Sequence, residues 1–460
     1  MRKKNIFSLS SYILLVLVML SFATDVRFAL PLPVARNLGV DLQLFEFFAF
    51  PLFIVLLFYF LSGQGKLIKQ DFIFLLFVIW AAMIAVADGP NFYHSISRVK
   101  DFFLAWVLFY VARELYIVYI YRLMILSALL GVLFSIIGLM QILGVDIWFG
   151  SGIGALFSAE NTWKTVVNPF TGNVWDAGFS QGLYRYPQNF IYYLILPLCF
   201  LAWMTTIRNL FVLPLIIVFL AMIGSGSKTF LILFTMGSVW LVFRKLFRFA
   251  YLPSMTGMLL SLFTLLALSA VIIPMDYLVK SGGTFIWRLE QWSDTFRMLI
   301  DVPVILITGH GTVYLEHIYS RFNYPNPHNA VLYFLMEYGV VGLVLFVLFL
   351  YSNLRYKDLR LSMLDSPGVH YQDTKSNCRC GSHRHNYNYA SLLGARNINS
   401  HGLLHFCGSK KFIYYGLAFT LVMTIVDDYF VQTQLTAIFF FYLGGLVNLR
   451  GYCKTFLIHT

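Results

Sequence analysis

Charged side chains are scarce in this chain: 12% of its 460 residues are Asp, Glu, Lys or Arg, whereas 59% are hydrophobic. Soluble globular proteins carry about 25% charged residues, so this composition excludes that class. Strict alternation of apolar and polar residues is also missing, and the apolar residues instead form long continuous runs. Such runs indicate membrane-spanning helices rather than the strands of a barrel. The sequence therefore predicts an all-α fold, a polytopic transmembrane helical bundle.

Cysteine is also rare, with five residues in the chain. None of them falls in a loop that we expect on the outer side of the membrane, which suits a protein without structural disulfides. A small-residue cleavage site is missing after the first apolar run, although Met1-Arg2-Lys3-Lys4 precedes that run as in a signal sequence. We therefore expect an uncleaved first span.

The net charge of +12 does not indicate a nucleic-acid partner, because the basic residues are not gathered on one polar domain. They lie in short loops between apolar runs, as the positive-inside rule describes. The runs predict a single integral membrane domain over residues 1–460 with about twelve spans of bilayer length. The predicted spans are 7–24, 43–62, 72–88, 102–119, 123–144, 189–205, 211–223, 229–243, 250–273, 329–351, 412–426 and 434–449.

The distribution of Lys and Arg predicts the orientation of these spans. With both termini in the cytoplasm, about 21 of them fall in inner loops and about 11 in outer loops, and Arg113 stays within the fourth span. Two outer (periplasmic) loops, 145–188 and 274–328, are then long, and long loops are the expected seat of function. The second contains a predicted interfacial helix from Phe285 to Ile300, with apolar residues at helical spacing.

A polar cytoplasmic loop at 352–411 contains a Cys-x-Cys-x2-His-x-His pattern that starts at Cys378. Its spacing matches no standard zinc site. Two interpretations stay open, a metal site and a variable linker, and we assign no metal ligand.

The segment Asn326-Pro327-His328-Asn329 stands at the start of the tenth predicted span. Asn326 is the predicted N-cap and Pro327 the first helical residue, which puts His328 in the first turn near the outer membrane boundary. Free N–H groups and the helix dipole favour an anion at that level, where the phosphates of a polyprenyl pyrophosphate would lie. The alternative is an interfacial histidine that only anchors the helix.

Nine residues separate Asn329 from Gly339, and Gly342 completes an H-N-x9-G-x-x-G pattern. This pattern resembles the O-antigen ligase and polymerase superfamily, whose members have it at the outer end of a late span. The resemblance covers about residues 185–351, and twelve spans with large outer loops are similar to that family as well.

The second outer loop adds Arg288-x3-Trp292 and Gly309-His310-Gly311, which look like elements that precede the His-Asn motif in the family. Two positions depart from the family pattern. Lys228 follows a serine where the family often has arginine, and it keeps the charge without bidentate phosphate recognition. Leu343 stands where ligases more often have a small or β-branched residue, which favours a polymerase.

The resemblance implies a glycosyltransferase of the bacterial inner membrane that uses an undecaprenyl-pyrophosphate-linked oligosaccharide as donor. His328 is the candidate catalytic base, since a neutral imidazole accepts a proton near neutral pH. Arg288 and Lys228, with Arg185 as a weaker candidate, would stabilise the departing pyrophosphate, and Asn329 would orient a sugar or phosphate oxygen. No cofactor and no metal is implied.

Three functions follow from these patterns. The leading hypothesis is an O-antigen polymerase, and the runner-up is the ligase that moves the glycan to lipid A-core. The third is a transporter of lipid-linked sugars, which is disfavoured because few ionisable groups remain within the spans. The implied partners are membrane lipid, the acceptor glycan or lipid A-core, a flippase and a chain-length regulator.

Several of these residues also have structural interpretations. Arg288 would snorkel from an interfacial helix, Lys228 would act as a topological charge, and Arg185 would anchor the sixth span. His310 and His317 are expected to be ordinary loop residues. Glu337 lies within the tenth span, where a carboxylate needs a partner or a proton. Glycines 339 and 342 are expected to permit close helix packing.

Overall fold

The computed structural model describes most of the predicted bundle. The described residues are 2–22, 27–29, 41–88, 92–142, 163–167, 174–178, 187–225, 283–311, 329–354, 409–421 and 433–459. The labelled helices are α1 (Arg2–Phe22), α3 (Leu44–Leu61), α4 (Lys69–Ala87), α5 (Phe92–Glu114), α6 (Ile117–Ile142), α8 (Pro187–Ile207), α9 (Val212–Gly224), α13 (Gly283–Asp301), α14 (Pro303–Thr308), α16 (Ala330–Leu354) and α18 (Thr433–His459). A further helix runs through residues 409–421.

Helices occupy ten of the twelve predicted spans, and the other two, 229–243 and 250–273, lie outside the described residues. Within the described part of the chain, four helices are long and apolar enough to cross a membrane: Lys69–Ala87, Ile117–Met140, Phe190–Ile207 and Ala330–Leu354. Four shorter apolar helices accompany them, Asn5–Ser21, Phe45–Leu61, Asn209–Gly224 and Leu435–Gly451. The helical class is confirmed, and the number of spans stays a prediction.

The fourth predicted span needs a correction. The sequence predicted a helix at 102–119, but α5 begins at Phe92 and ends at Glu114, and α6 begins at Ile117. The polar residues of 92–101, expected in an outer loop, therefore form the first turns of a helix. Arg113 lies in the last turn of α5 rather than inside a span.

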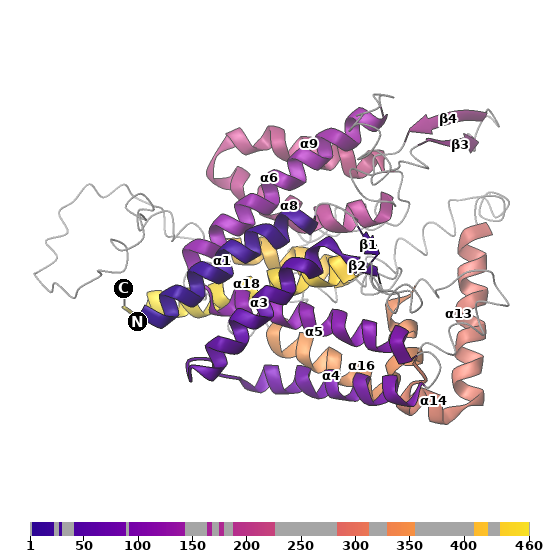
Figure 1. Ribbon diagram of the computed structural model, residues 1–460. Coiled ribbons are helices and arrows are strands. Elements are labelled where there is room, and N and C mark those ends of the chain that lie inside the picture. The colour runs from indigo at the N-terminus through magenta and orange to yellow at the C-terminus, as the bar shows by residue number, and fades with distance from the viewer. Residues whose placement is uncertain are drawn as a thin grey trace, which may run out of the picture.

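The helices pack with their axes roughly side by side, and both chain termini lie at one end of this bundle (Figure 1). We call that end the proximal end. The opposite end, where α4 ends and where α5 and α16 begin, is the distal end. Helix α13 crosses the distal end roughly perpendicular to the bundle helices (Figure 1), over the range predicted as an interfacial helix.

Two short β-hairpins, which the sequence did not predict, interrupt the helical pattern. Strand β1 (Arg27–Ala29) pairs antiparallel with β2 (Asp41–Gln43), and β3 (Trp163–Val167) pairs antiparallel with β4 (Val174–Gly178). The second hairpin falls within the predicted 145–188 loop.

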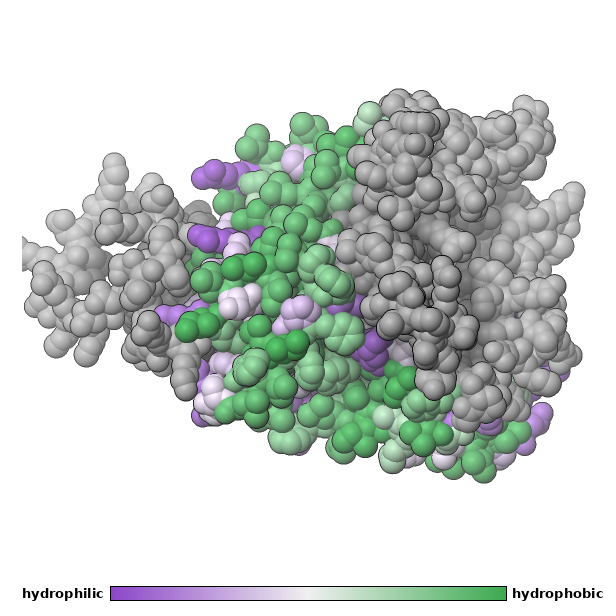
Figure 2. Space-filling view, viewed as in Figure 1, coloured by the Kyte–Doolittle hydropathy of each residue, from purple (hydrophilic) through white to green (hydrophobic). Residues whose placement is uncertain are grey.

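Apolar side chains cover the flank of the bundle (Figure 2). Phe58, Phe72 and Leu133 are each more than half exposed, on three different helices. Water would penalise such a surface, whereas the hydrocarbon core of a bilayer matches it. The flank is therefore that of a membrane protein.

An aromatic cluster holds α16 against its neighbours in the core. Phe74 on α4 lies 4.7 Å from Phe349 on α16, and Phe77 lies 5.5 Å from Phe346, as ring-centroid distances. Phe440 of α18 packs against Phe349 at 5.5 Å. Aromatic pairs at such distances add about 0.5–1.5 kcal/mol each beyond area burial, so α16 is firmly placed between α4 and α18.

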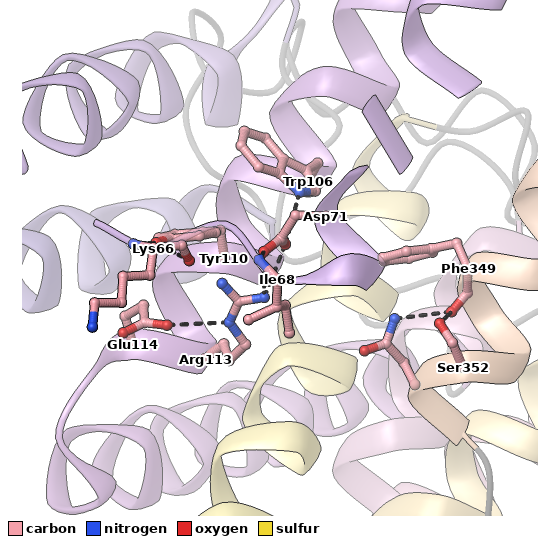
Figure 3. Close-up of polar contacts among 10 residues, drawn as sticks. Lys66, Ile68, Asp71, Trp106, Tyr110, Arg113, Glu114, Phe349 and Ser352 are labelled. Carbon is pink, nitrogen blue, oxygen red and sulfur yellow. Dashed lines mark hydrogen bonds and ion pairs between the residues drawn. The ribbon is translucent and has the colours of Figure 1, made fainter. Parts of the chain in front are cut away.

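At the proximal end, a buried ion pair joins α4 to α5 (Figure 3). The Arg113 guanidinium donates to both carboxylate oxygens of Asp71, at 2.8 Å and 2.9 Å. Asp71 also accepts the Ile68 N–H at 2.8 Å, which caps the first turn of α4. The guanidinium carbon lies 4.4 Å from the ring centroid of Tyr110. This pair fixes the start of α4 to the end of α5.

Candidate functional site at the distal end

Helix α16 begins with a side-chain cap at Asn329. The Asn329 side-chain oxygen accepts hydrogen bonds from the N–H groups of Val331 at 3.0 Å and Leu332 at 3.1 Å. Asn329 is therefore the N-cap, as expected of a short amide side chain at this position. The prediction that Asn326 caps this helix, with His328 in its first turn, is wrong, because the helix starts at Ala330. By sequence, His328 directly precedes the cap residue.

Gly339 interrupts α16 with a kink. Its φ of 66° and ψ of −175° are not helical, and an L-residue rarely adopts such a φ. A kink frees nearby carbonyl groups from their usual partners within the helix, so the residues just before Gly339 need hydrogen-bond donors from elsewhere.

The Gly309-His310-Gly311 turn supplies two of these donors. The His310 N–H donates to the Met336 carbonyl at 2.9 Å, and the Gly311 N–H donates to the Glu337 carbonyl at 3.2 Å. The indole N–H of Trp80, on α4, donates to the Tyr338 carbonyl at 2.9 Å. Three consecutive carbonyls of α16 are thus satisfied by other segments, which is how a buried kink avoids orphaned polar groups.

Glycine is required on both sides of this contact. A Cβ atom on Gly309 would lie 2.5 Å from the Glu337 carbonyl oxygen, and one on Gly339 would lie 2.3 Å from the Ile307 carbonyl oxygen. Gly309 and Gly311 have φ values of 78° and 66°. We call Gly309, Gly311 and Gly339 the glycine interlock. It explains why two short glycine motifs far apart in the sequence belong to one structural unit.

A polar cluster lies beside the interlock, between α4, α5 and α16, and consists of Asp88, Arg98, Tyr333, Glu337 and Tyr338. Arg98 is half-buried and the other four residues are buried. Glu337 is 1% exposed, and the positive charge of Arg98 acts on its carboxyl group. The hydroxyls of Tyr333 and Tyr338 approach the carboxyl without reaching ordinary hydrogen-bond geometry. Since a carboxylate at this depth needs a partner, Arg98 is the partner that the sequence left unidentified.

Further charges surround this cluster. The Ser95 hydroxyl donates a hydrogen bond to the Asp88 carboxylate, just beyond the end of α4. Lys100 forms an ion pair with Glu46 of α3 at 2.6 Å and lies 3.3 Å from Asp101. Polar and charged side chains in the first turns of α5 therefore interact with side chains of α3 and α16 and with Asp88 at the end of α4.

The structure describes little of the predicted catalytic set. Arg185, Lys228 and His328 lie outside the described residues. Arg288 falls on α13, at a position for which the structure describes the backbone only. Asn329 is described and 8% exposed. The Cys378 pattern and His317 also lie outside the described residues, so the proposed roles of all these side chains stay predictions.

Sequence reasoning missed Arg98 because it placed residues 92–101 in a loop. The available signal was the helical spacing of Ser95, Arg98 and Phe102, which puts the three on one face. Phe102 packs against Phe334 and Tyr338 at 5.6 Å and 6.0 Å, so this face is the one turned toward α16.

The comparisons with known proteins identify the same part of the chain. Residues 193–347 match the family model described as O-Antigen ligase. No curated protein and no solved structure matches the chain. The matched range contains the glycine interlock, the beginning of α16, and the positions of Lys228, Arg288 and His328, whereas Arg185 and Arg98 lie outside it.

Proposed function

We propose that this chain, whose residues 193–347 match the family model described as O-Antigen ligase, is a membrane glycosyltransferase that takes its glycan from a polyprenyl pyrophosphate carrier. We further propose that it is an O-antigen polymerase, which joins repeat units at the periplasmic face of the bacterial inner membrane. The described helices and the family match support a membrane protein of polysaccharide biosynthesis. The donor, the face and the acceptor are parts of the proposal.

The observation that carries the proposal is the glycine interlock. The family-like pattern consists of separate pieces in the sequence, a Gly-His-Gly turn and a His-Asn pair nine residues before a glycine. Gly309 and Gly339 are in contact, and Asn329 begins the helix that Gly339 kinks. The Gly-His-Gly turn and the Asn329–Gly339 segment therefore form one structural unit at the distal end.

In the proposed reaction an acceptor hydroxyl attacks the anomeric carbon of the lipid-linked sugar. The hydroxyl gives its proton to His328 as the new C–O bond forms, and the bond from the anomeric carbon to the pyrophosphate oxygen breaks. Arg288 and Lys228, with Arg185, stabilise the negative charge on the departing pyrophosphate. The Asn329 side-chain oxygen already caps α16, so its NH2 group is the part that would contact a sugar or phosphate oxygen.

The depth of the site fits a lipid-linked donor. Helix α4 has 19 residues, which at about 1.5 Å per residue approaches the roughly 30 Å of a hydrocarbon core. Asp88 then marks the distal boundary of that core, and Glu337 lies at the same level, because the Gly311 main chain touches both. Asn329 precedes Glu337 by eight residues, or about 12 Å of helix. That distance puts Asn329 at the outer margin of the headgroup layer, level with a sugar on its carrier.

A ligase is the second candidate, because the matching family is described as O-Antigen ligase. It would use the same donor and residues, and lipid A-core would be the acceptor. The match gives no support to a transporter.

The gel profile of surface polysaccharide tests the function. Cells that lack the protein should show core with a single repeat unit if it is a polymerase. Core with no repeat, together with long lipid-linked polymer, would instead identify a ligase. An unchanged profile would contradict both.

Returning His328→Ala to these cells tests the catalytic base. Loss of a general base lowers the rate by about 10²- to 10⁴-fold, so the defect should persist. His317→Ala, a histidine of the same predicted loop, is the matched control and should restore the wild-type profile. Full restoration by His328→Ala would show that this histidine is not the base.

A further inference from the structure

Helix α13 has polar side chains on its buried face. Gln291, Thr295 and Leu299 follow one another at four-residue spacing, which puts them on one side of the helix, and all three are buried. Phe296 and Ile300 lie on the other side and are more than half exposed. An amphipathic helix ordinarily buries its apolar face, so the two polar residues on the buried face of α13 need hydrogen-bond partners.

The two polar side chains differ in their hydrogen bonding. The Thr295 hydroxyl donates to the main-chain carbonyl of Gln291 at 2.7 Å, so it is satisfied within the helix. Gln291 is 2% exposed, and in the part of the chain that the structure describes its side-chain oxygen has no hydrogen-bond partner. A buried amide oxygen without a donor lowers stability, and such a group points to a donor that the chain itself does not supply.

The chemistry of this oxygen limits the class of ligand. An amide oxygen accepts hydrogen bonds and donates none. An ionised phosphate also only accepts, so it does not satisfy this atom. A sugar presents hydroxyl groups, each of which can donate a hydrogen bond. The buried oxygen of Gln291 therefore fits the glycan part of a lipid-linked donor rather than its pyrophosphate.

The position of Gln291 on α13 agrees with this choice. The helix crosses the distal end of the bundle and is followed by α14 and the glycine interlock (Figure 1). Position 288 comes three residues before Gln291, and positions at that spacing are neighbours on a helix, with about 5–6 Å between Cβ atoms. Arg288 is the proposed pyrophosphate-binding residue, and the first sugar of the donor is bonded to the pyrophosphate. A donor held at position 288 thus brings this sugar next to position 291.

We propose that Gln291 accepts a hydrogen bond from a hydroxyl group of the sugar bonded to the pyrophosphate, and thereby contributes to the selection of that sugar. This inference rests on the proposed function and adds a sugar-binding residue to the same site. A buried group that hydrogen-bonds a substrate hydroxyl discriminates strongly against ligands that lack it, because the group is then left unpaired. Gln291 is therefore a specificity residue, whereas Arg288 is proposed to act on charge and His328 on a proton.

Binding measurements on the purified full-length protein in detergent test this inference. The probes are the lipid-linked glycan extracted from cells that lack the protein, undecaprenyl pyrophosphate without a sugar, and undecaprenol. Wild type should bind the glycan most tightly. Gln291→Met keeps the length of the side chain without its amide, so it should bind the glycan about tenfold more weakly and undecaprenyl pyrophosphate as wild type does. Thr295→Val removes the other buried polar group of this face and, as the matched control, should bind all three probes normally.

Thermal unfolding adds a measurement that a structural role would change. Gln291→Met should unfold at the wild-type temperature or above it, because an apolar side chain replaces an unpaired buried amide. A variant that does not fold, or that loses binding of both pyrophosphates, would show that the amide supports the fold, and would overturn the inference.

The remaining outcomes separate the inference from the proposed function. If Gln291→Met prefers the glycan over undecaprenyl pyrophosphate as strongly as wild type does, the amide does not contact the sugar, and the inference is wrong while the proposed function stands. Equal binding of these two probes by wild type also overturns the inference alone. If wild type binds neither of them more tightly than undecaprenol, the proposed function fails together with the inference.

Discussion

Gly309 and Gly339 meet backbone to backbone, so that a Cβ atom on Gly309 would lie 2.7 Å from the Gly339 nitrogen and one on Gly339 would lie 2.5 Å from the Gly309 nitrogen. Backbone atoms cannot move aside as the end of a flexible side chain can. The turn at residues 309–311 and the kink of α16 therefore exist only together. This contact links the chain that follows α13 to the helix that Asn329 caps.

Gly339→Ala should lower stability strongly. The φ of 66° and ψ of −175° lie in a region that is essentially restricted to glycine and costs about 1–3 kcal/mol for an L-residue, and overpacking against the Ile307 carbonyl adds about 1–3 kcal/mol. Thermal unfolding in detergent measures the total. Gly63→Ala is the matched control, because Gly63 has a φ of 73° and a Cβ atom added there would have nothing within 4 Å, so it should show the backbone cost alone. Equal losses for the two variants would contradict the interlock.

The two functions of Asn329 can be separated by substitution. Asn329→Ala removes the helix cap and should cost about 0.5–2 kcal/mol of stability. Asn329→Ser keeps an oxygen that can cap the helix but has no NH2 group, so it should retain stability and lose glycan transfer. Unfolding in detergent and the polysaccharide profile measure the two effects. Normal transfer by the stable serine variant would limit Asn329 to its capping role.

The effects of replacing Arg98 and Glu337 on the free energy of unfolding should be coupled. Removing Arg98 leaves the buried Glu337 carboxyl group without its cationic neighbour, which costs about 3–5 kcal/mol. Glu337→Gln should cost less, because Arg98 is half-buried and keeps the interaction with Asp101. A double-mutant cycle with Arg98→Ala and Glu337→Gln should give a coupling energy of about 0.5–3 kcal/mol. Arg98→Ala combined with Glu114→Ala, at the other end of α5, should be additive within about 0.5 kcal/mol. Additive losses for the Arg98 and Glu337 substitutions would show that the two charges do not interact.

Stability should fall when Arg113 or Asp71 is replaced alone, and it should largely return when both are replaced by apolar side chains. Both side chains are buried, with 6% and 0% exposure, so Arg113→Ala should cost about 3–5 kcal/mol. Arg113→Met with Asp71→Leu should recover much of that loss, because two apolar side chains leave no buried charge. Arg122→Ala, an exposed arginine on α6, should change stability by less than about 0.5 kcal/mol. A double variant less stable than Arg113→Ala would contradict this account.

The sequence predicted most of the described helices because their cause is local. A long apolar run that must satisfy its own backbone in lipid becomes a helix whatever its neighbours are. The run of α16 is such a case, and in α13 the helical spacing of apolar residues is an equally local signal. Two sequence predictions were wrong. The first turns of α5 are polar and were predicted to be a loop, and the N-cap of α16 was assigned to the wrong one of two nearby asparagines. The sequence predicted Asn326 as the N-cap. Asn329 caps the helix instead, because its side-chain oxygen accepts hydrogen bonds from the N–H groups of Val331 and Leu332.

By itself, the sequence determined the membrane class and the H-N-x9-G-x-x-G pattern, but it did not indicate that the chain bends at Gly339. Only the tertiary structure decided that the charge of Arg98 acts on Glu337, that Gly309 meets Gly339, and that Asp71 pairs with Arg113. These pairs join helices that are distant along the chain, and hydropathy says only that a helix lies in the membrane, not which helix lies beside it. That choice depends on the packing of side chains between helices, where aromatic rings such as those of Phe74 and Phe349 interlock.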